Sequence, residues 1–199
     1  LFRRGNFNGS WDQIICDALI DVKGADISLS PGFRWGTTIM PGQAITFDDL
    51  MTQTAITYPE TYARDMTGET IKLILEDVAD NLFNADPFYQ QGGDMVRTGG
   101  ISYRIDPTAA MGKRITNIEL TKNGKKLQAS KTYKVAGWST VGSKSPGEPI
   151  WETVATYLQN MKHIEKVKVD SPDIIGVKGN PGIASVTYTH LKLPTNREV

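Results

Sequence analysis

Two loops of this sequence place an arginine among glycines and bulky side chains, a pattern suited to binding an oxyanion. In the segment SPGFRWGTT, Arg34 stands between Phe33 and Trp35. In the segment GGDMVRTGG, Arg97 stands between two glycine pairs. A guanidinium offers a planar fork of N–H donors to a tetrahedral anion, and neighbouring glycines let backbone N–H groups approach the same ligand. We therefore interpret both segments as candidate substrate-binding loops.

Both arginines also have structural explanations, which the sequence leaves open. In these, Arg34 stacks on Trp35 at the surface, and Arg97 forms a salt bridge with Asp94 or a neighbouring acid. Trp138 ends a predicted strand, so it belongs either to the wall of a pocket or to the core. The residue types alone do not choose between binding and packing.

The second loop contains four glycines, which are Gly92, Gly93, Gly99 and Gly100. Glycine at the entry to a strand indicates that a ligand or another backbone comes close. The alternative is that these glycines form a bulge and a turn of the fold itself.

Motifs for catalysis are missing from the chain. Its two histidines, His163 and His190, and its one cysteine, Cys16, are too few and too scattered to form a metal cluster. We find no G-x-S-x-G elbow and no Walker loop. We therefore expect neither catalytic nor metal-binding residues here. Cys16 has no partner for an internal disulfide, and its place on the apolar side of a predicted helix favours a buried thiol.

Composition excludes two broad classes of partner. Lys and Arg number 22 and so do Asp and Glu, which leaves no net charge to attract nucleic acid or an anionic membrane. No apolar run approaches the ~20 residues that a membrane span requires. The 199 residues suit one medium-sized domain or two small ones, and because the chain starts with Leu1 we expect it to belong to a longer protein.

Helices and strands alternate along the chain around the two loops. Helical periodicity follows Ser10, which we expect to be the N-cap, and continues to Gly24. Thr46 with Asp49 predicts a short helix, and a further helix is expected after Thr67. The last predicted helix covers 150–161, and the predicted strands cover 25–30, 57–66, 101–105, 114–120, 125–129 and 131–138.

The predicted strands include a hairpin, which decides the fold class. The strands 114–120 and 125–129 flank Asn123 and Gly124, a pair typical of a type I′ turn. Hairpins among interleaved helices favour an α+β fold, with layered helices packed on mixed sheets, over a doubly wound parallel sheet. We expect one domain over residues 1–186. The segment 187–199 has no periodicity, which is typical of a disordered tail or an artificial extension.

The strings ISLSPGFRWGTTIMPGQAITFDDLM, MTGETIKLILEDVADN, GGISYRIDP and KTYKVAG, in this order, resemble the C-terminal domain of 5′-nucleotidases. The similarity spans about residues 8–160. It implies a substrate-binding domain whose partner is an N-terminal metallophosphoesterase domain of the same protein. It also implies that Arg34 takes the position of an arginine that grips the substrate phosphate.

Other strings look more like one branch of that family, the SoxB thiosulfohydrolases of bacterial sulfur metabolism and thiosulfate oxidation. These are DNLFNADPFYQQGGDMVRTGG, SPGFRWGTT and TYPETYARDMTGE. Nucleotidases stack the base between aromatic residues, whereas Met95 stands near one of those positions here. The resemblance implies a periplasmic enzyme that releases sulfate from a cysteine-S-sulfonate on the arm of a SoxYZ carrier. It places two manganese ions in the N-terminal domain, so that this chain alone is inactive.

We keep two other functions open. One is the substrate domain of a 5′-nucleotidase or another phosphomonoesterase, and the other is a non-catalytic module that binds a carrier or a peptide. In the favoured interpretation, the glycines of the second loop leave room for the thin carrier arm. The expected substrate-binding residues are Gly32, Phe33, Arg34, Trp35, Gly93, Asp94, Met95, Arg97 and Trp138.

Overall fold

The computed structural model describes residues 1–3, 5–33, 35–140 and 146–176. The helices are α1 (Ser10–Lys23), α2 (Phe47–Thr54), α3 (Gly68–Leu82) and α4 (Ile150–Met161), with a short 3-10 turn, η1 (Pro87–Tyr89). The strands are β1 (Ile27–Ser30), β2 (Thr61–Thr67), β3 (Arg97–Gly99), β4 (Ile101–Ile105), β5 (Ile115–Leu120), β6 (Thr132–Trp138) and β7 (Asp173–Ile174).

The strands of the described residues form two mixed sheets. The first has the order β2-β6-β1-β3, in which β1 runs parallel to β6 and the other neighbours are antiparallel. The second has the order β5-β4-β7, with β4 antiparallel to β5 and parallel to β7. Helices and mixed sheets together confirm the predicted α+β class.

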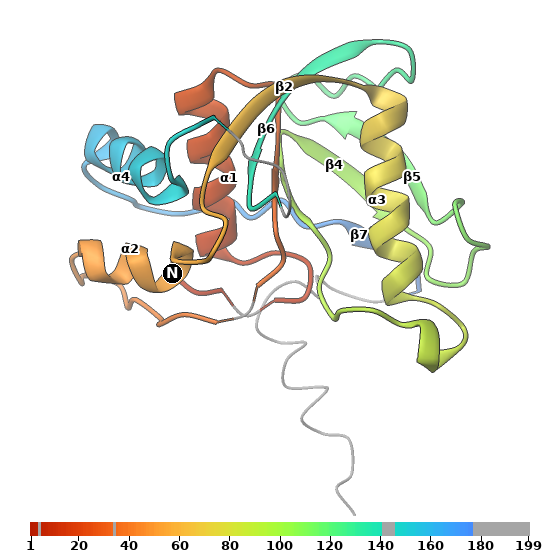
Figure 1. The fold of residues 1–199 in the computed structure, drawn as a ribbon, viewed down its shortest axis with the longest axis horizontal. Helices are drawn as coiled ribbons and strands as arrows, with labels where there is room; N and C mark the ends of the chain where they lie inside the picture. Colours follow the sequence, from red (N-terminus) through yellow and green to blue (C-terminus); the bar gives the residue numbers. More distant parts are fainter. Residues whose placement is uncertain (4, 34, 141–145, 177–199) are drawn as a thin grey trace, which may run out of the picture.

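Helices lie on either side of the first sheet (Figure 1). Helix α1 packs on β1 and β3 and is itself covered by α4, whereas α3 packs against β2 and β5. The larger core lies between α3 and the strands of both sheets, and the smaller core lies around α1, α2 and α4. Apolar residues at helical spacing therefore face the sheets, as the sequence predicts.

The helix termini follow the predicted caps with one exception. Thr46 and Asp49 form a complete capping box at α2, and the Thr67 side chain accepts from the N–H of Thr70 at α3. At α1 the N-cap is Gly9 rather than the expected Ser10. The Ser10 hydroxyl instead accepts a 2.8 Å hydrogen bond from the N–H of Phe2, because the N-terminal segment folds back onto the start of the helix.

The predicted hairpin around Asn123 and Gly124 forms, but its second arm is shorter than the expected strand 125–129. The N–H of Leu120 donates to the carbonyl oxygen of Lys125, and the N–H of Leu127 donates to that of Ile118. An antiparallel bridge joins Glu119 to Lys126, and β5 also pairs with β4. Gly124 has a positive φ of 66°, whereas Asn123 does not, so the turn is not type I′. The Asn123 side chain accepts from the N–H of Lys125, which favours a local turn over a continued ladder.

Two further expectations concern burial and membranes. Cys16 is buried, and burial raises the pKa of its thiol above the usual value, as expected for an inert packing residue. No helix among the described residues is long and apolar enough to cross a membrane. The predicted tail at 187–199 lies outside the described residues.

Candidate substrate-binding site

Sheet topology brings the two candidate loops to one edge of the first sheet. Strands β1 and β6 are parallel, with Leu29 opposite Gly137, so both strands end at this edge. Strand β3 runs the other way and begins there, with Arg97 opposite Ser30. The loop after β1, the loop before β3 and the end of β6 at Trp138 therefore converge.

Gly32 lets the two loops touch. A Cβ atom at this position would lie 2.6 Å from the carbonyl oxygen of Met95 and 2.7 Å from the Cβ of Asp94, closer than real Cβ atoms approach other atoms. A hydrogen bond of 2.7 Å from the Asn6 side chain to the carbonyl oxygen of Gly93 ties the N-terminal segment to the same place. Gly93 itself is exposed, and Asp94 is half-buried.

Three aromatic side chains form a stack behind this edge. Phe33 and Trp35 lie face to face, with ring centroids 3.9 Å apart and an interplanar angle of 23°. Trp138 meets Phe33 edge-on, with centroids 6.3 Å apart. Trp35 is 44% exposed, whereas Trp138 is buried and donates from its indole Nε1 to the hydroxyl of Ser30. Trp35 is thus the most exposed member of the stack.

Arg97 lies beneath the loops rather than on their surface. It is fully buried, and its NH1 group donates to the carbonyl oxygens of Asn6 and Met95. Its NH2 group lies 3.4 Å from both the carbonyl oxygen of Phe33 and the Asp94 carboxylate. The salt bridge to Asp94 was the structural alternative for this residue. Met95 is also fully buried and belongs to the larger core.

Arg34 lies outside the described residues, but its neighbours on both sides are described. Four of the expected site residues therefore reach the surface of this edge to some degree, namely Gly32, Phe33, Trp35 and Gly93, and Asp94 is half-buried beside them. Met95, Arg97 and Trp138 are buried behind them.

Two residues that support this edge, Arg3 and Asp12, do not stand out in the sequence. Their side chains are fully buried and form an ion pair of 2.7 Å, and the guanidinium of Arg3 lies 5.2 Å from the ring centroid of Phe33. Burial raises the pKa of Asp12 and lowers that of Arg3, and the ion pair opposes both shifts. The one local indication was an acid in the first turn of α1, which is common at helix N-termini and does not mark a site.

The glycines of the second loop divide into two groups. A Cβ on Gly99 would lie 2.5 Å from the Ser28 hydroxyl and 2.9 Å from the Cβ of Cys16, because α1 crosses β3 closely. A Cβ on Gly100, which has a φ of 78°, would similarly clash with the carbonyl oxygen of Asp26. These two glycines serve the packing of the fold. Gly92 has open space around its Cβ position and so leaves room for another chain, and the neighbouring Gly93 is exposed.

No group of three or more His, Cys, Asp or Glu side chains that could hold a metal comes together among the described residues. The residues present on this part of the chain therefore do not fit a dinuclear metal site.

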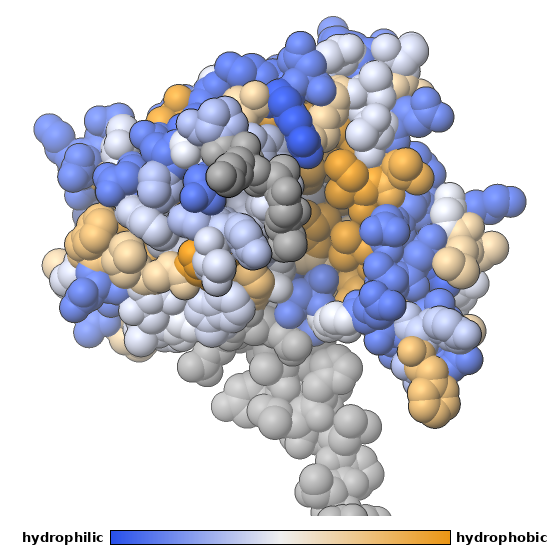
Figure 2. All heavy atoms as spheres, viewed as in Figure 1, coloured by the Kyte–Doolittle hydropathy of each residue, from blue (hydrophilic) through white to orange (hydrophobic). Residues whose placement is uncertain are grey.

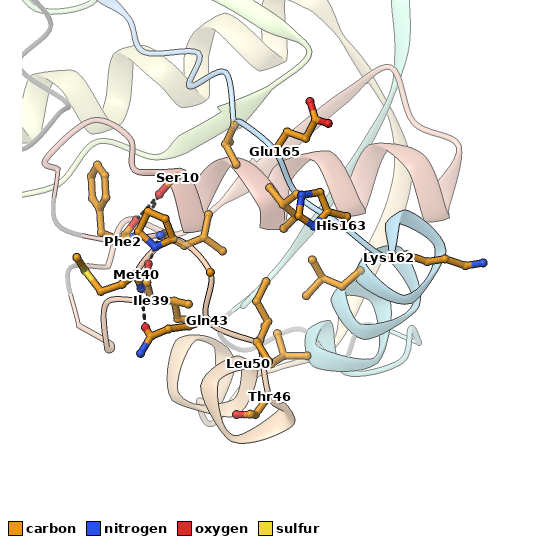
Figure 3. A pocket seen from close by; sticks show the side chains of 18 of the residues that line it. Phe2, Ser10, Ile39, Met40, Gln43, Thr46, Leu50, Lys162, His163 and Glu165 are labelled. Carbon is orange, nitrogen blue, oxygen red and sulfur yellow. Dashed lines mark hydrogen bonds between the residues drawn. The ribbon is translucent and has the colours of Figure 1, made fainter.

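Two other surface features lie apart from this edge. A cavity of about 990 Å³ opens between the loop before α2 and the end of α4 (Figure 3), and none of the expected site residues is among its described lining. Leu1, Met40 and His163 are among the residues that line it. In Figure 2, apolar residues gather near the position that α3 occupies in Figure 1. A separate apolar group protrudes from the surface at the segment after that helix. Phe88, which is 95% exposed, belongs to the segment after α3.

Comparisons with known proteins identify the family and the fold. The family model for the 5′-nucleotidase C-terminal domain matches residues 7–153. The Thermus thermophilus sulfate thiohydrolase SoxB, solved in complex with glycerol, is 36% identical over 89% of this chain, with a TM-score of 0.80. A 5′-nucleotidase precursor from Thermus thermophilus has a TM-score of 0.68 at 18% identity over 89% of the chain, which shows the shared fold.

The comparison with curated protein sequences gives no significant match. The chain spans about a third of the length of the solved relatives, 34% of the SoxB chain and 37% of the nucleotidase precursor. Members of the family are hydrolases whose catalytic domain is a separate N-terminal domain. On the family match and the fold together, the chain belongs to the 5′-nucleotidase C-terminal domain family.

Proposed function

We propose that this chain is the substrate-recognition domain of a SoxB-like hydrolase that releases sulfate from a cysteine-S-sulfonate carried by a SoxYZ-like protein. The observation that carries the proposal is the convergence of the Arg34 loop and the 93–96 loop at one sheet edge, where Gly32 touches Met95. The identity of 36% to SoxB supports the choice of this branch of the family.

The chemistry of the reaction sets what this domain must do. Water attacks the sulfonate sulfur, the S–S bond breaks, and the electron pair of that bond leaves with the cysteine sulfur, giving sulfate and a thiol. Two manganese ions in the N-terminal domain would supply the activated water. This domain would hold the sulfonate oxygens through Arg34, whose fork of donors matches a tetrahedral oxyanion. We expect the whole protein to act in the periplasm.

The exposed parts of the edge suit a substrate carried on a narrow arm. Trp35 presents an aromatic face backed by Phe33, and the exposed Gly92 and Gly93 of the second loop carry no side chains of their own. An extended, glycine-rich peptide needs a surface without protruding side chains, because its backbone must pass close to the loop.

One observation favours the second candidate function, a nucleotidase domain. The exposed face of Trp35 offers a planar platform on which a nucleobase would stack. The platform is one-sided in the described residues, because the other aromatic partners, Phe33 and Trp138, lie behind Trp35 instead of opposite it.

The test compares substrates on the longer protein that combines this chain with an N-terminal metallophosphoesterase domain. With manganese present, we expect sulfate release from a carrier peptide that bears a cysteine-S-sulfonate, and a lower kcat/KM for nucleoside monophosphates. The isolated chain should hydrolyse neither. A higher kcat/KM for nucleotides would replace the proposal with the nucleotidase function, and turnover by the isolated chain would exclude a purely substrate-binding role.

A further inference from the structure

We propose that Arg3 and Arg97, joined through Asp12, are positioning residues that hold the two candidate loops in their binding arrangement. All three side chains are buried. Asp12 lies between the two guanidiniums, with its Oδ1 2.7 Å from the Nε of Arg3 and its Oδ2 3.4 Å from the Nε of Arg97. A single carboxylate in the first turn of α1 thus forms ion pairs with both cations, of which the one to Arg3 is also a hydrogen bond.

The other guanidinium donors bind main-chain carbonyl oxygens of the loops. Arg3 donates to the carbonyl oxygen of Pro31 at 3.3 Å, and Arg97 lies 3.4 Å from that of Phe33. Arg97 also donates to Met95 in the second loop, at 3.0 Å. The remaining carbonyl partners are Gly5 and Asn6 for Arg97 and Gln53 for Arg3. The cluster therefore contacts the main chain of both loops and of the N-terminal segment.

These carbonyl groups belong to loop residues outside the β1–β3 ladder, and the guanidiniums supply donors to them. A buried carbonyl without a donor costs about 1–3 kcal/mol. A guanidinium supplies five N–H donors in one rigid plane, whereas a lysine ammonium is a point charge on a flexible stem. Two arginines on one carboxylate can therefore set the relative position of several carbonyls at once.

Buried ion pairs are weak evidence for stability, since hydrophobic groups of similar size often stabilise a core as well. The pattern of contacts argues for positioning instead. Pro31 and Phe33 lie on the N-terminal side of Arg34, and Met95 is the residue against which Gly32 packs. Because a misplacement of about 1 Å in a binding group can reduce catalysis by about 100-fold, fixing these carbonyls fixes the site.

This inference rests on the proposed function only for the identity of the ligand that the loops bind. Its structural part is measured on the chain itself through the environment of Trp35. The chain contains four tryptophans, so labelling with 5-fluorotryptophan gives four ¹⁹F resonances, and the variant Trp35→Phe assigns the resonance of interest. We expect Arg97→Lys and Asp12→Asn to shift or broaden this resonance. Arg3→Lys should also do so, in part directly, because the Arg3 guanidinium lies 6.0 Å from the ring centroid of Trp35.

A matched control comes from a similar arginine elsewhere in the fold. Arg114 is also buried, pairs with Asp80 at 2.9 Å and donates to the carbonyl oxygen of Pro107, but it joins α3 to the start of β5. Arg114→Lys should lower the melting temperature and leave the Trp35 resonance in place. Asp12→Asn is the second test variant, because it removes the shared charge and keeps both arginines.

Kinetics on the longer protein complete the test. At a temperature well below melting, we expect Arg3→Lys and Arg97→Lys to raise KM for the S-sulfonate about 10-fold, a loss of ~1.4 kcal/mol in binding, with a smaller change in kcat. Arg114→Lys should leave both constants unchanged.

The outcomes separate the two proposals. If Arg3→Lys, Arg97→Lys and Asp12→Asn lower the melting temperature while the Trp35 resonance stays in place, the cluster serves stability alone and the inference is overturned. The inference is also overturned if Arg114→Lys shifts the Trp35 resonance as much as the three test variants do. A moved resonance with unchanged KM supports the positioning of the loops and contradicts the proposed function, because the loops would then not bind the substrate.

Discussion

The indole Nε1 of Trp138 donates a 2.8 Å hydrogen bond to the hydroxyl of Ser30, joining the ends of two parallel strands in a buried position. Ser30 ends β1 and Trp138 ends β6, so this bond lies directly beneath the candidate loops. It fixes the edge-on contact of Trp138 with Phe33.

We expect Trp138→Phe to lower the free energy of unfolding by about 1–3 kcal/mol, because it leaves the Ser30 hydroxyl without its donor and removes packed surface. Ser30→Ala should cost less. Urea unfolding of both single variants and the double variant checks this, with an expected coupling energy of about 1 kcal/mol. Additive losses would show that the bond contributes nothing by itself.

Gly99 and Gly92 should respond differently to a side chain. Gly99→Ala forces a Cβ against Ser28 and Cys16, and we expect it to destabilise the domain by about 1–3 kcal/mol. Gly92→Asn should change stability by less than about 0.5 kcal/mol, because asparagine tolerates positive φ and the position is open. Thermal melts of the two variants decide this, and equal losses would contradict the packing assigned to Gly99.

Gly93 tests whether a carrier arm passes over the second loop. The residue is exposed and its φ is not positive, so Gly93→Leu should leave the melting temperature unchanged. In the longer protein, we expect this variant to lower kcat/KM severalfold for the carrier-linked S-sulfonate and to leave a small S-sulfonate unaffected. If Gly93→Leu changes kcat/KM equally for both substrates, or for neither, no carrier arm passes over Gly93.

Arg34→Lys tests the anion contact in the longer protein. Lysine retains the charge and loses the planar fork of donors, so kcat/KM should fall by about 10-fold or more. The comparison variant is Lys122→Arg, which changes an exposed cation on another part of the surface and should have no effect. If Arg34→Lys leaves the kinetics unchanged, Arg34 does not hold the anion, and the alternative of surface stacking on Trp35 is favoured.

Asp17 gives a prediction for pH dependence. Its carboxyl is half-buried, and burial, with the nearby charge of Asp170, raises its pKa, while a 2.8 Å hydrogen bond from Gln13 opposes the shift. For an acid with a raised pKa in the folded state, the stabilising contribution is present below the unfolded pKa of about 3.9 and is lost as pH rises through the folded pKa. Asp17→Asn should therefore be more stable than the parent at pH 7.

The advantage of Asp17→Asn should shrink as pH falls to about 4 and below, where the parent carboxyl is protonated. Asp26 supplies the opposite case, because its bond to Lys122 lowers its pKa. Asp26→Asn should be less stable than the parent at pH 7, and this difference should vanish as pH falls through the folded pKa of Asp26. Unfolding in urea at several pH values measures both, and parallel curves for Asp17→Asn and the parent would contradict the assigned shift.

The sequence by itself determined the elements that depend on neighbouring residues. The capping box of Thr46 and Asp49, the cap at Thr67 and the left-handed glycine that ends α1 all involve contacts within a few positions along the chain. Apolar periodicity likewise determined which faces of α1 and α3 are buried. The resemblance identified the family and the loop that holds Arg34.

Only the tertiary structure decided how the loops are held. Arg3, Asp12 and Arg97 meet although 85 positions separate the last two (97 − 12), and nothing near Arg97 in the sequence distinguishes a buried arginine from an exposed one. The pairing of β5 with β4 and the contact of Gly32 with Met95 likewise join residues that are not neighbours in the sequence. Such contacts depend on strand order and on competition between partners far apart in the chain, and local residue patterns carry no information about either.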